Sequence, residues 1–143
     1  MKTKVSIFVL NFVAILSLFA CAITPIAGNW ESPNRFTIEQ VFDAAVRAGS
    51  LNGYIVASQD RNAGTISLSK PTKGLDARQG SRTMTVIITG STGRIVVRTN
   101  IMADVNTLAP VLNEETNNFY VYLTRELGIT NPAERQVTVG PPR

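Results

Sequence analysis

Residues 83–99 read TMTVIITGSTGRIVVRT, and this stretch decides the fold class. Apolar side chains occupy every second position on both sides of a turn signal, GSTG, at 90–93. Such alternation is typical of half-buried strands, so the stretch predicts two antiparallel strands with one apolar face. The residues expected on that face are Met84, Val86, Ile88, Ile95 and Val97.

A second hairpin is predicted upstream, in GYIVASQDRNAGTISLS at 53–69. Strands are expected on either side of DRNAG at 60–64, which makes the connection. The polar side chains of this loop could bind a ligand, but Asp and Asn also bond local backbone in turns, and Gly64 accepts a positive φ. We therefore interpret 60–64 as turn chemistry rather than as a binding site.

Two amphipathic helices are predicted to flank the four strands. A capping box at Thr37 opens a helix over about 38–48, and Gly49 is expected to end it. A second helix is expected to begin near Asn113 and to end at Gly128. The predicted order is α-β-β-β-β-α, an α+β fold in which a four-stranded antiparallel sheet has both helices on its apolar face.

The first twenty residues have the layout of a secretory signal peptide. Two lysines, at positions 2 and 4, precede an apolar run that ends at Ala20. A retained transmembrane helix is the alternative, but a single span needs about 20 apolar residues, and this run is shorter and contains Asn11. We therefore predict that 1–20 is a signal peptide.

Cys21, the only cysteine of the chain, directly follows the apolar run. Leu18-Phe19-Ala20-Cys21 resembles the lipobox of bacterial lipoproteins, and this resemblance implies that Cys21 becomes the acylated first residue of the mature protein. Ala20-Cys21-Ala22 also fits an ordinary cleavage site after Ala22, which would leave a soluble periplasmic or secreted protein. We favour the lipobox, because a lone cysteine at this place has no structural partner.

Acylation would hold the domain on a bilayer, since several acyl chains bind membranes far more tightly than one. The lipoprotein resemblance implies the bacterial cell envelope, and Ala22 after the cysteine favours the outer membrane, with the domain facing the periplasm. Residues 21–35 are then predicted to be the lipidated cysteine and a tether. Residues 36–129 are predicted to form a single domain, and 130–143 a proline-rich C-terminal tail, although QVTV at 136–139 could add an edge strand.

Composition excludes several kinds of chemistry. The chain has 14 Lys and Arg against 10 Asp and Glu, and without the two lysines of the signal peptide the excess falls to +2 with no basic block. This argues against a nucleic-acid partner. Because histidine and a second cysteine are absent, histidine-dependent nucleophiles, histidine zinc sites and intrachain disulfides are excluded. We predict no catalytic residue, no metal ligand and no cofactor.

The segment 36–129 resembles the helix-grip-like repeat domains of the BamC family of outer-membrane assembly lipoproteins. The resemblance implies a fold and a compartment rather than an activity. The matching residues are Gly53, Tyr54, Val56, Asp60, Gly64 and Ile66.

Two groups of residues are candidates for contacts. Lys73 and Arg78 lie in the predicted loop 71–81 and could form a cationic rim for an anionic lipid or an acidic partner, or belong to a merely solvated loop. Tyr120 and Tyr122 point to different sides of the second predicted helix, so only one can be in the core. The other could be an exposed contact residue.

Two functions are compatible with these observations. The leading hypothesis is a membrane-anchored bacterial lipoprotein with a small non-enzymatic domain that binds envelope proteins, as an assembly or structural accessory. The alternative is a periplasmic module that binds a small ligand or a lipid. The alternative requires an apolar cavity that core side chains leave open, whereas a partner-binding domain would be packed solid.

Overall fold

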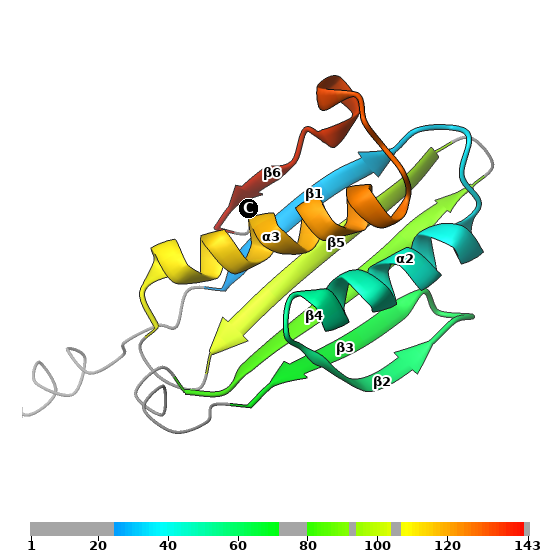
Figure 1. Ribbon diagram of the computed structural model, residues 1–143. Helices are drawn as coiled ribbons and strands as arrows, with labels where there is room; N and C mark the ends of the chain where they lie inside the picture. Colours follow the sequence, from blue (N-terminus) through cyan, green and yellow to red (C-terminus); the bar gives the residue numbers. More distant parts are fainter. Residues whose placement is uncertain (1–24, 72–79, 92–93, 104–106, 142–143) are drawn as a thin grey trace, which may run out of the picture.

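The computed structural model describes residues 25–71, 80–91, 94–103 and 107–141. Six strands form one antiparallel sheet in the order β2-β3-β4-β5-β1-β6, and two helices that contact each other cover one face of it (Figure 1). The strands are β1 (Ile26–Ser32), β2 (Ile55–Asp60), β3 (Thr65–Lys70), β4 (Arg82–Ser91), β5 (Arg94–Ala103) and β6 (Thr138–Gly140). The helices are α2 (Ile38–Leu51) and α3 (Ala109–Glu126), and the 3-10 helix η3 (Pro132–Arg135) precedes β6.

The α+β class is confirmed, but the prediction of a four-stranded sheet in the order α-β-β-β-β-α is wrong. Two strands lie outside the four that were predicted. β1 lies in the segment predicted as a tether, and β6 lies in the predicted tail. β1 inserts between β5 and β6. Its inward positions are Ile26, Gly28, Trp30 and Ser32, so a glycine and a serine interrupt the apolar alternation that identifies a strand. β6 has only three residues, too few to carry a pattern.

The hairpin at 83–99 buries the face that was predicted. Its five inward residues, Met84, Val86, Ile88, Ile95 and Val97, are all at most 4% exposed. The connection at 60–64 is also confirmed as a turn, because Asp60 Oδ1 accepts the N–H groups of Asn62 and Ala63, and Gly64 has a φ of 65°. The local pattern and the turn residues were sufficient for both hairpins.

Helix α2 begins with the predicted capping box. Thr37 Oγ1 accepts the N–H of Gln40 at 3.2 Å, and the Gln40 side chain accepts the N–H of Thr37 at 2.9 Å. The prediction that Gly49 ends this helix is wrong, since α2 continues to Leu51. A Cβ on Gly49 would lie 2.6 Å from Leu68 Cδ1, so this glycine permits a close approach of helix and sheet.

Helix α3 begins at Ala109, one turn before the predicted start near Asn113. Pro110 stands in its first turn, where a missing backbone N–H costs nothing because it would have no helical partner. The N-cap is Leu108, whose side chain makes no capping hydrogen bond. A start on a proline after an apolar cap carries no polar capping signal, which is why the sequence prediction placed it too late.

The core lies between the sheet and the helices. Its largest side chains that are at most 1% exposed are the aromatic ones, Trp30, Tyr120, Phe42 and Phe119. The rings of Phe119 and Tyr120 meet edge to face, with centroids 5.3 Å apart. Where α3 crosses β1, Gly28 leaves room for the Tyr120 ring, because a Cβ there would lie 2.5 Å from Tyr120 Cε2.

Candidate functional site

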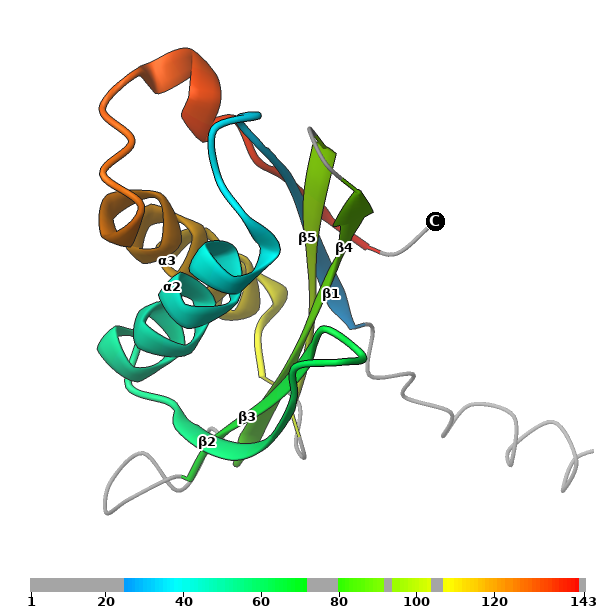
Figure 2. The same cartoon turned by 90° about the vertical axis from the view of Figure 1, so that its right-hand side faces the viewer.

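The sheet face opposite the helices is the largest candidate surface. Seen edge-on, both helices lie on one side of the sheet, and no element of the described ranges covers the other side (Figure 2). We call this side the open face. At its centre, Ile87 of β4 pairs with Arg98 of β5, which pairs in turn with Asn29 of β1. The neighbouring outward residues of these strands are Thr83, Thr85, Thr89, Asn100, Val96 and Glu31.

Charge on the open face is concentrated in two arginines and one glutamate. Arg94 Nε lies 3.0 Å from Glu31 Oε1, and both side chains are more than half exposed, so this surface pair contributes little to stability. Arg98 is exposed, and no carboxylate pairs with it in the described part of the chain. Beside it Ile87 is 39% exposed. A cation beside an apolar group and hydroxyls suits contact with another protein.

A buried ionic cluster lies at one end of the sheet, around Glu115 of α3. Glu115 Oε1 accepts hydrogen bonds from Lys70 Nζ at 2.9 Å and from Arg82 Nη1. Glu115 Oε2 accepts one from the Tyr54 hydroxyl at 2.8 Å, and the Glu115 carbonyl accepts one from Asn52 Nδ2 at 2.9 Å. Burial, together with the charge of Glu115, raises the pKa of Tyr54 well above its ordinary value.

This ionic cluster joins α3 to the ends of β3 and β4 and to the turn between α2 and β2. Lys70 and Arg82 both contact the carboxylate of Glu115, and the hydrogen bonds named above run within the domain. The role of Glu115 in this cluster was not predicted from the sequence. Its position one helical turn before Phe119 and two before Leu123 places a carboxylate on an apolar stripe, which is the signal that could have revealed it.

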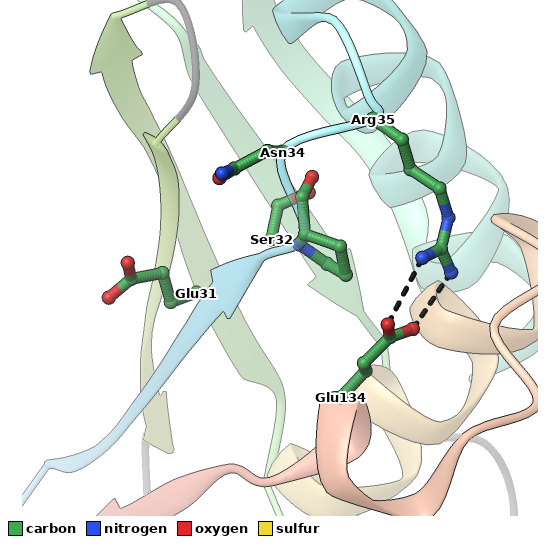
Figure 3. Close-up of a pocket in the computed structure, with 6 residues that line it drawn as sticks. Glu31, Ser32, Asn34, Arg35 and Glu134 are labelled. Carbon is green, nitrogen blue, oxygen red and sulfur yellow. Dashed lines mark hydrogen bonds and ion pairs between the residues drawn. The ribbon is translucent and has the colours of Figure 1, made fainter.

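A shallow groove of about 500 Å³ lies at the other end of the molecule, between the β1–α2 connection and η3 (Figure 3). Arg35 Nη1 and Nη2 donate to the two carboxylate oxygens of Glu134, at 3.1 and 2.8 Å, whereas Glu31 points away from this pair (Figure 3). The hydrogen bond from Arg35 lowers the pKa of Glu134. Trp30 Nε1 donates to the carbonyl of Glu134 at 2.9 Å. These contacts attach η3 to the sheet, and they explain the groove as a structural junction.

The residues predicted to make contacts lie in different environments or outside the described residues. Cys21, Lys73 and Arg78 lie outside the described residues. Tyr120 is buried, and its hydroxyl lies 3.1 Å from both Thr99 Oγ1 and the Val97 carbonyl, so it is a core residue rather than a surface contact. Burial raises its pKa. Tyr122 is half-buried and packs against the edge of the core.

The described ranges contain neither a membrane-spanning helix nor a metal-binding cluster. None of their helices combines the length and the apolar character needed to cross a membrane. No group of three or more His, Cys, Asp or Glu side chains within them is placed to hold a metal ion.

Comparison with known proteins identifies no family for this chain. No protein-family model matches the chain. No curated protein matches it either. Among solved structures, a conserved protein from Geobacillus kaustophilus is similar over 73% of this chain and 95% of its own, with 11% sequence identity and a TM-score of 0.39. A likeness this distant carries no argument about the function of this chain.

Proposed function

We propose that this protein is a membrane-anchored bacterial lipoprotein whose small, non-enzymatic domain binds an envelope protein as an assembly or structural accessory. The observation that carries this proposal is the open face of the sheet (Figure 2). A sheet with helices on one side leaves a broad surface that another protein can cover. The partner would place a carboxylate opposite Arg98 and an apolar group opposite Ile87, since complementary charge gives an interface its specificity.

The proposed anchor is the acylated Cys21. Acyl chains would supply the membrane attachment by themselves, which leaves the open face free for a protein. The lipobox resemblance of residues 18–21 supports this part of the proposal, and Ala22 supports the outer membrane with the domain in the periplasm.

Packing favours partner binding over the binding of a small ligand or lipid in the interior. Such a module would need unfilled space between the helices and the sheet. Aromatic side chains that are at most 1% exposed occupy that layer instead, namely Trp30, Phe42, Phe119 and Tyr120. A second groove, of about 310 Å³, lies at the edge of this layer and is lined by residues of α3 and of the segment before β6, among them Tyr120, Val121 and Val137. We therefore propose no ligand-binding function.

Site-specific crosslinking in the native envelope tests the partner-binding function. A photoreactive residue at position 87 of the full-length chain is expected to give one discrete adduct with an envelope protein, and Arg98→Glu should abolish that adduct. The matched control is position 121, because Val121 is 59% exposed but lies on α3, across the molecule from the open face. Equal adducts from positions 87 and 121, or an adduct that survives Arg98→Glu, would contradict a role of the open face.

The intact mass of the native protein tests the anchor. A mature chain that begins at Cys21 and carries acyl chains is expected to fractionate with membranes, and Cys21→Ser should lose both properties. A mature chain that begins at Ile23 without acyl chains would overturn the anchor.

A further inference from the structure

The end of the domain from which the chain leads back to Cys21 contains the ends of several elements. β1 begins there at Ile26, which pairs with Ile101 near the end of β5. The antiparallel ladder then places the start of β4, the end of β3 and the start of β2 at the same end, because Arg82 pairs with both Ala103 and Lys70. α2 ends and α3 begins there as well (Figure 1). We call this the anchor-side end.

Exposed apolar side chains gather at the anchor-side end. In the described part of the chain, six large hydrophobic residues are exposed, and four of them belong to this end. Two further ones, Ile87 and Val121, lie along the body of a strand and of a helix. The four at the anchor-side end, with their exposed fractions, are Leu51 (52%), Ile55 (62%), Met102 (50%) and Leu108 (72%).

Leu108 breaks a local rule of helix formation. It is the N-cap of α3, a position where Ser, Thr, Asp or Asn would bond a free backbone N–H. Leucine makes no such bond, and it is also the most exposed large apolar side chain at this end. A residue that is unfavourable both as a cap and in water indicates a role outside the folded domain.

The distance to the proposed anchor is short. Five residue steps separate Cys21 from Ile26, and a fully extended chain of this length spans at most about 18 Å. The headgroup region of one leaflet is roughly 5–8 Å thick. An acylated Cys21 would therefore keep the anchor-side end within a short reach of the lipid surface.

We propose that the anchor-side end is itself a membrane contact, with Ile55, Met102 and Leu108 seated in the headgroup region of the leaflet that holds the acyl chains. This inference rests on the proposed lipid anchor at Cys21. Its partner is a phospholipid surface, because exposed apolar side chains are stabilised in the interfacial region. Lys70, whose side chain is 32% exposed, lies at the same end and brings a positive charge there, which suits anionic headgroups.

A depth measurement on the native, lipidated full-length protein tests this contact. An environment-sensitive fluorophore is attached to the introduced thiol of the variants Ile55→Cys and Leu108→Cys. The variants Ile87→Cys and Val121→Cys, labelled in the same way, are the matched exposed controls. Acylation blocks the sulfur of Cys21, so each variant offers a single thiol. In vesicles of phosphatidylethanolamine and phosphatidylglycerol, spin-labelled lipids should quench the fluorophores at 55 and 108 several-fold more than those at 87 and 121.

Two outcomes separate this inference from the proposed anchor. Equal quenching at all four positions in a protein whose mass includes the acyl chains would overturn the membrane contact and leave the anchor intact. A protein without acyl chains, with all four fluorophores in water, would overturn both.

A second variant, Leu108→Ser, removes the apolar side chain without weakening helix α3, because serine supplies the missing N-cap hydrogen bond. A loss of membrane contact in this variant is therefore not explained by unfolding. We expect its melting temperature to be maintained or raised, while quenching of the fluorophore at position 55 falls. A fall in melting temperature with unchanged quenching at 55 would instead give Leu108 a purely structural role and contradict the contact.

Discussion

Gly28 is the residue on which the close packing of β1 against α3 depends. A Cβ at this position would lie 2.5 Å from Tyr120 Cε2 and 2.6 Å from Thr99 Oγ1. We expect Gly28→Ala to lower the free energy of unfolding by about 1–3 kcal/mol, because overpacking displaces well-ordered core groups. Chemical denaturation measures this change.

Gly140→Ala is the matched control, since Gly140 lies on the neighbouring strand β6 and a Cβ there would meet nothing within 4 Å. Its effect should stay within about 0.5 kcal/mol. Equal denaturation midpoints for the two variants would show that Gly28 is not a packing requirement.

Glu115 is the residue on which the stability of the buried ionic cluster depends. Its carboxylate is the shared partner of Lys70 and Arg82, and Arg82 has a side chain only 7% exposed. We expect Glu115→Gln to destabilise the protein by about 3 kcal/mol, because the buried Arg82 then loses the charge of this partner. Thermal and denaturant unfolding provide the measurement.

Glu126→Gln is the control for this prediction on the same helix. Glu126 pairs at 2.7 Å with Arg47, whose side chain is 55% exposed, so the loss should be about 0–1 kcal/mol. A Glu115→Gln variant no less stable than Glu126→Gln would mean that the ionic cluster is not a buried one in solution.

Among the elements, β6 protects the outer edge of β1. It pairs with residues 27–29, and Val137 and Val139 pack against the edge of the core. A chain that ends at Gln136 should lose about 2 kcal/mol of stability, because two half-buried valines and a strand pairing are removed. Hydrogen exchange at residues 27–29 should accelerate in the same variant.

A chain that ends at Gly140 keeps β6 and serves as the control for this truncation. We expect its melting temperature and its exchange rates to equal those of the full-length protein. If the chain that ends at Gln136 behaves in the same way, β6 has no part in holding β1.

At the scale of the whole molecule, two tyrosines make the layered core sensitive to alkaline pH. Burial raises the pKa of both Tyr54 and Tyr120 above the ordinary value near 10. The unfolded chain would therefore lose these protons at a lower pH than the folded protein does. Stability is fully present below pH 10 and should fall progressively as the pH rises above it.

Two measurements check this alkaline prediction together. The melting temperature should fall above pH 10, and the tyrosinate absorbance of both residues should appear only with unfolding. The variant Tyr120→Phe removes one of the two groups and should weaken the pH dependence. Titration of both tyrosines in a protein that stays folded would contradict the prediction.

The two proposals together give the molecule an orientation. The strands extend lengthwise from the anchor-side end to the opposite end, so a contact of the anchor-side end with lipid would stand the sheet on the membrane (Figure 1). The plane of the sheet would then be parallel to the bilayer normal, and the open face would be directed sideways, where a neighbouring envelope protein can reach it (Figure 2). One end would contact lipid and one face would contact protein.

Local patterns in the sequence determined the two hairpins and the start of α2. Alternation identified the buried face of 83–99, and Gly64 and the capping box at Thr37 act within a few residues of themselves. The resemblance of residues 18–21 to a lipobox is local too, so the proposed anchor could be inferred from the sequence, although Cys21 lies outside the described residues.

Only the tertiary structure decided the strands β1 and β6 and the surfaces. β1 contains a glycine and a serine where a strand pattern expects apolar residues, and it becomes a strand because β5 offers its edge. Glu115 finds partners 33 to 61 positions away, and the open face and the anchor-side end combine residues from several strands. Such groupings arise from long-range pairing, which no short stretch of sequence encodes, whereas hairpins and helix caps are encoded locally.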